Sequence, residues 1–191
     1  MLAYRWSRWP TITYWTMGRQ VGLSDTVAAA KAAGFPYIGI GVNADAAWAP
    51  YVTTINGTYI AVVGVSQVAE LASSWVATDT RPGEANAIDL ARTLAAVRVV
   101  KQLAKIVIVF MHWGTEGESC PDASQLALAP QLAAAGADII VGSHAHELQG
   151  LGLAWPHVRG LRLGQLPLVG ELLQHRHRSA GTEPAPERAT D

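Results

Sequence analysis

Residues 136–150 read GADIIVGSHAHELQG, and this stretch indicates the fold class. The apolar run at 138–142, DIIVG, lies between glycines, which is typical of a short buried strand. His144 and His146 follow directly, in a polar loop that leaves the end of this strand. Because Gly142 allows the backbone a tight turn, we expect the two imidazoles to converge on one point.

The same order of elements precedes this stretch. KIVIVFM at 105–111 predicts a second buried strand, and the polar segment HWGTEGESC follows it at 112–120. Apolar residues at helical spacing predict a helix over 85–103, and DASQLALAPQLAAA predicts another over 122–135. Strands that alternate with helices indicate an α/β protein with a parallel or mixed sheet and flanking helices.

Capping and breaking residues predict where the helices begin and end. Gly136 should end the helix over 122–135, and Pro130 should kink or break it. Nearer the N-terminus, Ser24 should cap a helix that ends at Gly34.

The first half of the chain also predicts strands. YIGIGV at 37–42 is typical of a short buried strand. YVTTI at 51–55 and TYIAVVGV at 58–65 flank Asn56-Gly57, which favours a β-hairpin with a type I′ turn. In sheets of this class, chemistry collects in the loops at the carboxyl ends of the strands.

Composition excludes several classes of partner and site. The 191 residues carry a formal net charge of −1, which gives no electrostatic reason to expect nucleic acid. Cys120 is the only cysteine, so neither an intrachain disulfide nor a thiolate zinc cluster can form. The longest apolar run, at 106–111, is far shorter than the roughly 18 residues of a membrane span. The N-terminal segment has no secretory signal pattern, and nothing indicates an oligomeric state.

His112, His144 and His146 are the candidate metal ligands. All three follow predicted buried strands, where neutral imidazoles can bind a divalent cation. The alternatives are a hydrogen-bonded histidine at the strand end for His112 and an ordinary polar loop for the other two. Glu116 lies close to His112 in sequence, and it can either hydrogen-bond a ligating histidine or act as a general acid or base.

Other polar residues carry weaker signals. We expect Glu118 to be a solvated carboxylate and Cys120 to be an unreactive thiol, because no base adjoins it in sequence. Asn43 and Asp45 follow a predicted strand and could line the same sheet edge. The remaining histidines belong to a solvated basic stretch near the C-terminus; they are His157, His175 and His177.

Three histidines do not complete a two-metal phosphoesterase centre. Such a centre also needs carboxylates that hold two cations about 3.5–4 Å apart. The sequence contains no Gly-Asp, Asp-x-His or Asn-His pattern that would supply these ligands.

Several segments resemble the CapA family of capsule and poly-γ-glutamate biosynthesis proteins. They are GFPYIGIG at 34–41 with Asn43 after it, YIAVVGVS at 59–66, MHWGTE at 111–116 and PQLAAAGADIIVGSHAHELQG at 130–150. The resemblance covers residues 18–153, about 70% of the chain. The pair HWG-x-E and GADxxxGxHxH, in this order and spacing, is specific.

The resemblance has several implications. It implies part of a calcineurin-like metallophosphoesterase layered fold, α/β in class, with a mixed sheet and flanking helices. It implies that His112, His144 and His146 bind a divalent metal (Mn, Fe, Zn or Mg) beside Glu116. A polymer or phosphoester-type substrate and a cell-envelope or extracytoplasmic location are expected on the same ground.

The two ends of the chain depart from the family pattern, which also has a Gly-Asp strand, a block like ANNHxLDYG and a closing strand like YSLGNF. Shifted by two bases, a back-translation of residues 7–18 can read TMANNHVLDYG. Shifted by one base, residues 158–173 can read YVAYGLGNFLWWENSY. We therefore expect residues 1–17 and 154–191 to be irregular segments read out of frame, around an α/β core at 18–153. The coding DNA tests this hypothesis.

Three functional hypotheses follow. The chain is a CapA-like metal-dependent hydrolase, or an inactive fragment of that family, or a small α/β binding module in which the histidines are structural. Metal content and phosphoester turnover distinguish them.

Overall fold

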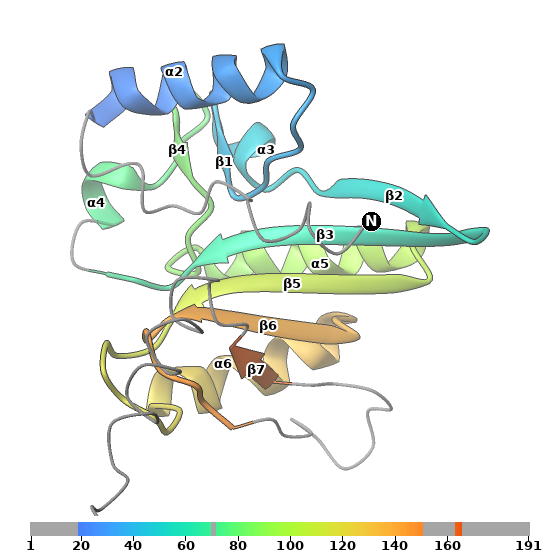
Figure 1. Ribbon diagram of the computed structural model, residues 1–191, viewed down its shortest axis with the longest axis vertical. Helices are drawn as coiled ribbons and strands as arrows, with labels where there is room; N and C mark the ends of the chain where they lie inside the picture. The colour runs from blue at the N-terminus through green and yellow to red at the C-terminus, as the bar shows by residue number, and fades with distance from the viewer. Residues whose placement is uncertain (1–18, 70–71, 151–162, 166–191) are drawn as a thin grey trace, which may run out of the picture.

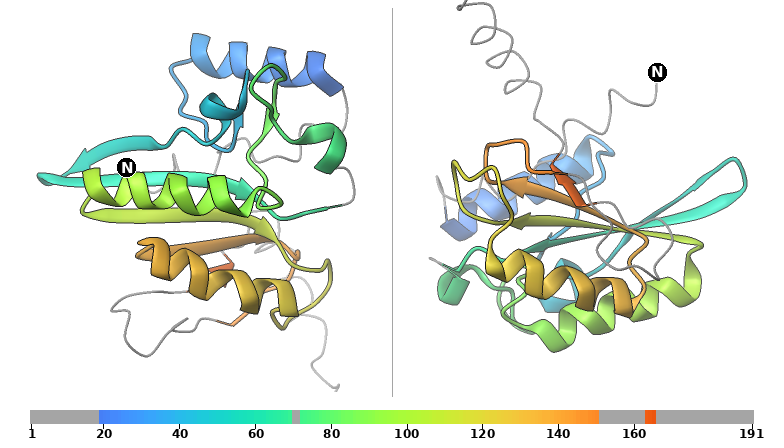
Figure 2. Two further views of the ribbon diagram at one scale, coloured as in Figure 1. Left: turned by 180° about the vertical axis from the view of Figure 1, so that it is seen from behind. Right: turned by 90° about the horizontal axis from the view of Figure 1, so that it is seen from below.

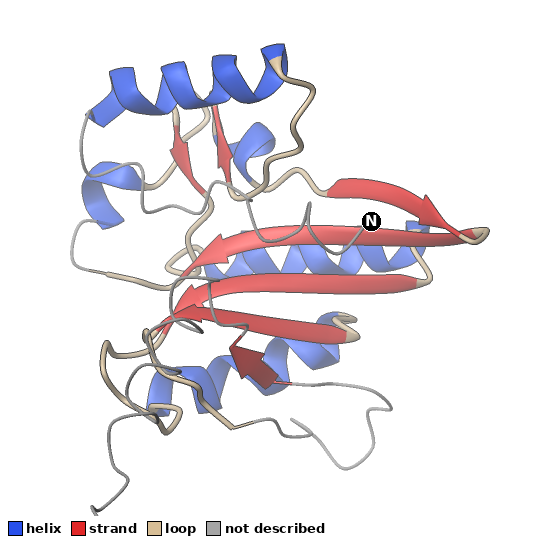
Figure 3. Ribbon diagram, in the orientation of Figure 1, coloured by secondary structure: helices blue, strands red, loops and turns tan. Residues whose placement is uncertain are grey.

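The main feature of the computed structural model is a mixed five-stranded sheet (Figures 1 and 3). The structure describes residues 19–69, 72–150 and 163–165. The strand order is β2 (Tyr51–Ile55), β3 (Thr58–Ser66), β5 (Ile106–Trp113), β6 (Ile139–His144) and β7 (Leu163–Gln165). β2 and β3 pair antiparallel, whereas β3, β5, β6 and β7 run parallel to one another. The predicted α/β class with a mixed sheet is confirmed.

The hairpin of β2 and β3 forms as predicted. Asn56 and Gly57 both have positive φ values, of 49° and 73°, as a type I′ turn requires. The register pairs Ile55 with Thr58 directly across the turn. This turn fixes which side chains of β3 face the core.

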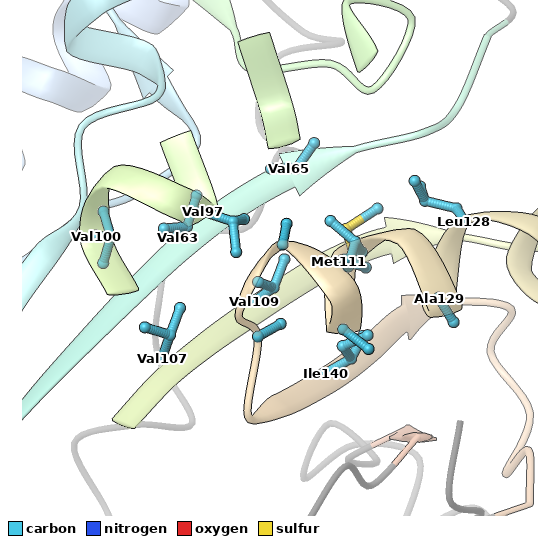
Figure 4. Close-up of a cluster of buried hydrophobic side chains, with 14 of the residues drawn as sticks. Val63, Val65, Val97, Val100, Val107, Val109, Met111, Leu128, Ala129 and Ile140 are labelled. Carbon is cyan, nitrogen blue, oxygen red and sulfur yellow. The ribbon is translucent and has the colours of Figure 1, made fainter. Parts of the chain in front are cut away.

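Helices α5 (Leu90–Leu103) and α6 (Ala123–Ala135) pack on the same face of the sheet (Figure 2). Side chains of β5 alternate between the two faces, because successive residues of a strand point in opposite directions. The buried ones join side chains of both helices in the main core; they are Val107, Val109, Met111 and Trp113. Figure 4 shows the first three of them in this cluster. The half-buried ones, which include His112, occupy the opposite face.

The helix ends differ in part from the prediction. α5 begins at Leu90 behind its N-cap Asp89, and not at residue 85, because Ala85 and Ala87 bond to the backbone of Ser66, the last residue of β3. A break at Pro130 is wrong, since α6 continues through it. Buried leucines on both sides of the proline and a capping box at the N-terminus hold this helix together.

Gly136 ends α6 as predicted. Its φ of 118° lies in the left-handed region, and its N–H bonds to the last turn of the helix. Asp138 follows and accepts hydrogen bonds from the backbone of Val107 and from Lys101. These contacts attach the start of β6 to both β5 and α5.

A smaller layer lies beside the β2–β3 edge of the main sheet (Figure 1). It contains α2 (Arg19–Ala32), α3 (Ala44–Ala47), α4 (Ala72–Trp75) and a two-stranded sheet of β1 (Ile40–Gly41) and β4 (Gly83–Glu84). The strand predicted over 37–42 is therefore only two residues long. None of the described helices is long and apolar enough to cross a bilayer.

The prediction that Ser24 caps a helix is wrong, because α2 starts five residues earlier at Arg19 and Ser24 lies inside it. Leu23 and Val27, one turn apart, anchor this earlier start by packing against Ile40. The helix still ends near Gly34, whose φ is 60°.

The two segments predicted to be irregular, 1–17 and 154–191, lie outside the described residues except for β7. β7 is a short strand, paired in parallel register with β6. The out-of-frame hypothesis for these segments stays a prediction.

Candidate functional site

The carboxyl ends of β5 and β6 bring the three predicted histidines together. Parallel register places His112 beside Ser143 and Trp113 beside His144. The ring centroids of His112 and His144 are 4.6 Å apart, and those of His144 and His146 are 6.4 Å apart. Two loops separated by 31 residues in sequence therefore share one sheet edge.

His144 and His146 have an uncommon backbone conformation. Their φ values are 98° and 56°, and Asn56 in the hairpin turn is the only other non-glycine residue of the described ranges with a positive φ. Such conformations cost on the order of 1 to 3 kcal/mol each, and they concentrate at functional sites. Gly142, which we expected to provide the turn, remains inside β6, so the histidines themselves turn the chain.

Glu116 reaches the same edge from the loop after β5. One carboxylate oxygen, Oε1, is 3.9 Å from His144 Nδ1 and 3.9 Å from His146 Nε2. Both distances exceed those of a hydrogen bond, so the contact is electrostatic. Gly114, with a φ of 94°, turns the chain back toward the histidines, and the N–H of Gly117 donates to the carbonyl of Ala145 over 2.8 Å.

Burial keeps His112 uncharged. The pKa of this imidazole falls to about 4, mainly because of burial and with smaller contributions from the nearby charges of His144 and His146. The hydroxyl of Ser143 donates to the carbonyl of Met111 over 3.1 Å and lies 3.3 Å from His112 Nδ1. Since that hydroxyl proton is already engaged, Ser143 accepts from Nδ1–H, and the lone pair of Nε2 is left for another partner.

These side chains have the right donor types for one divalent cation, in an open arrangement. Atoms bound to one ion through bonds of about 2.1 Å lie roughly 3 to 3.5 Å apart. The 3.9 Å separations from Glu116 to the two imidazoles are slightly wider. Accordingly, no three His, Cys, Asp or Glu side chains within 19–69, 72–150 and 163–165 lie in positions that enclose an ion.

Other predicted candidates lie apart from the histidines. Glu118 and Cys120 have exposed side chains, and their carbonyls accept hydrogen bonds from Gln149. The expectation that Asn43 and Asp45 line this edge is wrong. Asn43 caps α3, and Asp45 pairs with Arg92 at 3.6 Å. His157, His175 and His177 lie outside the described residues.

A buried polar group beside the site was not predicted. Ser66 is next to His112 in the register of β3 and β5, and it also pairs with Asn86. Asn86 donates to Glu84 Oε1 over 2.8 Å, and all three side chains are buried. Burial raises the pKa of Glu84 to about 7, although hydrogen bonds from Asn86 and Ser66 oppose this rise. In sequence, Glu84 sits in RPGEAN, which is typical of a solvated loop.

A family model described as bacterial capsule synthesis protein PGA_cap matches residues 17–158. The chain belongs to this family. The predicted CapA resemblance is therefore confirmed, over a range close to the predicted 18–153.

Two relatives of the PGA_cap family have similar sequences. The capsule biosynthesis protein CapA of Bacillus anthracis is 34% identical over 131 residues, which cover 67% of this chain and 31% of the relative. The PGA biosynthesis protein CapA of Bacillus subtilis is 33% identical over 129 residues, which cover 67% of this chain and 33% of the relative. The chain spans about a third of the length of these relatives.

A solved structure shows the same fold. The sulfate thiohydrolase SoxB of Thermus thermophilus superposes with a TM-score of 0.53 at 21% identity, over 79% of this chain and 26% of that one. This likeness confirms the predicted calcineurin-like metallophosphoesterase fold of this PGA_cap chain, and it shows the fold alone.

Proposed function

We propose that this PGA_cap chain carries a divalent-metal site of the phosphoesterase type, which serves capsule or poly-γ-glutamate assembly at the cell envelope. The observation that supports it best is the convergence of His112, His144, His146 and Glu116 at one sheet edge. Two of the four have a backbone conformation that costs stability, and a functional requirement explains why that cost is tolerated.

The three histidines are the proposed metal ligands. His112 is neutral at physiological pH and has Nε2 available, as a ligand must. Three imidazoles favour zinc or iron over magnesium, which prefers oxygen ligands. When bound, such an ion polarises a phosphoryl oxygen or lowers the pKa of a water molecule.

Glu116 is the proposed general acid or base. Its side chain is exposed, so it can exchange protons with solvent, and it lies beside both imidazoles of the second loop. A phosphoester or a polymer is the expected substrate class. This expectation depends on membership of the family and on the donor types at the edge.

A second candidate function is an inactive fragment of the same family, with weak metal affinity and no turnover. The open spacing around Glu116 favours it, because the described donors do not enclose an ion as they stand. The absence of bridging carboxylates within the described residues also excludes a two-metal centre built from that part of the chain alone.

One experiment distinguishes these functions. The full chain is dialysed against zinc, manganese or iron, and both metal content and turnover of bis-p-nitrophenyl phosphate are measured. A variant with His112, His144 and His146 all changed to Ala is compared with the exposed control Gln131→Ala. Stoichiometric metal with turnover, lost only in the triple variant, supports the hydrolase. Weak, substoichiometric metal without turnover supports the fragment, and no metal with an intact fold supports a binding module.

A further inference from the structure

Gln149 connects the two loops of the site through side-chain hydrogen bonds to residues other than the proposed ligands. Its side-chain Nε2 donates to the carbonyl of Glu118 over 3.1 Å and to that of Cys120 over 3.2 Å. Both carbonyls belong to the loop that carries Glu116. Its Oε1 accepts from Gln125 Nε2 over 2.9 Å, and Gln125 is buried at the start of α6.

The orientation of both amides follows from one backbone N–H. In the capping box, Gln125 Oε1 accepts from the N–H of Asp122, which can only donate. Gln125 must therefore present Nε2 to Gln149, and Gln149 must present Oε1 in return. Both hydrogens of Gln149 Nε2 then meet carbonyls, which only accept. A carboxylate in either place would leave an acceptor facing an acceptor.

A backbone hydrogen bond also joins the same two loops. The N–H of Gly117, directly after Glu116, donates to the carbonyl of Ala145, which lies between the two histidines. Thr115 also donates to Asp122, so the loop after β5 is tied to the cap of α6 as well. The side chain of Glu116 is therefore exposed, but hydrogen bonds fix Thr115 and Gly117 on either side of it.

We infer that Gln149 is a positioning residue, which holds the Glu116 loop against the His144–His146 loop. The amide of Gln149 keeps the carboxylate of Glu116 within reach of the two imidazoles. It also restricts the loop before metal binds, so that less conformational entropy is lost on binding. What the carboxylate and the imidazoles do there rests on the proposed function. The connection between the loops does not depend on it.

The first test needs no metal. Amide hydrogen exchange of Gly117 is measured in the full chain and in three variants: Gln149→Met, Gln125→Glu and the control Gln131→Met. Gln149→Met keeps the length of the side chain without its hydrogen bonds, and Gln125→Glu keeps the capping box but loses the donor to Gln149. Exchange at Gly117 should accelerate about fivefold to tenfold in both, the effect of one or two net hydrogen bonds, and stay unchanged in the control. Unchanged exchange in both variants would overturn the inference.

The second test uses cobalt(II) as the probe, followed by its visible absorption. Gln149→Met should weaken cobalt binding about fivefold to tenfold, but have no further effect in a Glu116→Gln background, because it acts through that carboxylate. An equal loss in both backgrounds would show that Gln149 does not act through Glu116. If the unmodified chain binds no cobalt, the proposed function fails, and the exchange measurement alone decides the role of Gln149. Because Gln125→Glu preserves the helix cap, it serves as the second variant if Gln149→Met fails to fold.

Discussion

Asn86 donates to Glu84 over 2.8 Å, and Glu84 is only 1% exposed. Asn86 and His112 pair with the same residue of β3, from opposite sides. Ser66 lies between them in the sheet and bonds to the backbone on both sides of Asn86. The second oxygen of Glu84 has no hydrogen-bond partner among the described residues. Burial with one oxygen unpaired favours the protonated form of this carboxyl group.

Glu84 should therefore make stability depend on pH. Its pKa rises from 4.5 to about 7 on folding, mainly because of burial. Between these values Glu84 is ionised in the unfolded chain and protonated in the folded one, so its contribution to the free energy of unfolding falls as pH rises, by about 3 kcal/mol in all. Below pH 4.5 and above pH 7 this contribution is constant. His112, whose pKa falls to about 4 on folding, contributes a slope of the opposite sign, so the test is the difference between two chains. The free energy of unfolding of the unmodified chain minus that of Glu84→Gln should fall by about 3 kcal/mol between pH 4.5 and pH 7, as measured by urea unfolding from pH 4 to pH 8. The same difference for the exposed control Glu118→Gln should not change with pH, and a constant difference for Glu84→Gln would contradict the prediction.

Ser143→Ala should weaken metal binding without removing a ligand. The hydroxyl accepts from His112 Nδ1 and so holds the ring with Nε2 available. Loss of such a partner typically weakens metal affinity 10- to 100-fold. Calorimetric titration with zinc measures the change, and Ser24→Ala on the surface of α2 is the control. Equal affinity of Ser143→Ala and the unmodified chain would refute the assigned role.

His144→Gly should be more stable than His144→Ala, by about 1 kcal/mol or more, because only glycine adopts a φ of 98° without strain. Both variants should bind metal less tightly than the unmodified chain. His112→Gly and His112→Ala are the matched pair. His112 lies in a β-strand, so here the alanine variant should be more stable than the glycine variant. Urea unfolding at one pH measures all four. If the alanine variant at 144 is at least as stable as the glycine variant, the backbone there is unstrained.

Gly114→Ala should destabilise the site loop. The φ of 94° is strained for alanine, and a Cβ there would lie 3.0 Å from Gln125 Oε1. We expect a loss of about 1 to 2 kcal/mol in the free energy of unfolding, together with weaker metal binding. Gly22→Ala is the opposite case, because that glycine lies inside α2 with nothing within 4 Å of the added carbon. It should stabilise the protein by about 0.5 to 1 kcal/mol. Equal effects of the two substitutions would contradict this account.

The position of His112 beside His144 could be predicted from the sequence. Two apolar runs, each followed by a polar loop, predict parallel neighbouring strands, and parallel strands end at the same edge. The family motifs named the same residues. The motifs do not contain the path of the backbone. They favour a turn at Gly142, whereas His144 and His146 make the turn in the structure.

Residues that act through long-range contacts were not predictable in this way. Gln149 lies inside the quoted motif, but its partners are the carbonyls of a loop about 30 residues earlier and a side chain of α6. Glu84 lies among loop-forming residues, and it is buried where its own strand pairs with Ile40 and Val76 and where Asn86 pairs with Ser66. Local pattern predicts elements well, whereas the burial of a polar group depends on which elements meet.

The left-handed conformation of His144 and His146 also predicts how this loop would evolve. If a lineage no longer needed metal chemistry, glycine or asparagine at either position would relieve the strain. Selection for stability would then favour these two residues among the substitutions that persist. Histidine at both positions would persist only under selection for its imidazole. A census of natural variants at these two codons would therefore separate lineages that still use the site from lineages in which it is decaying.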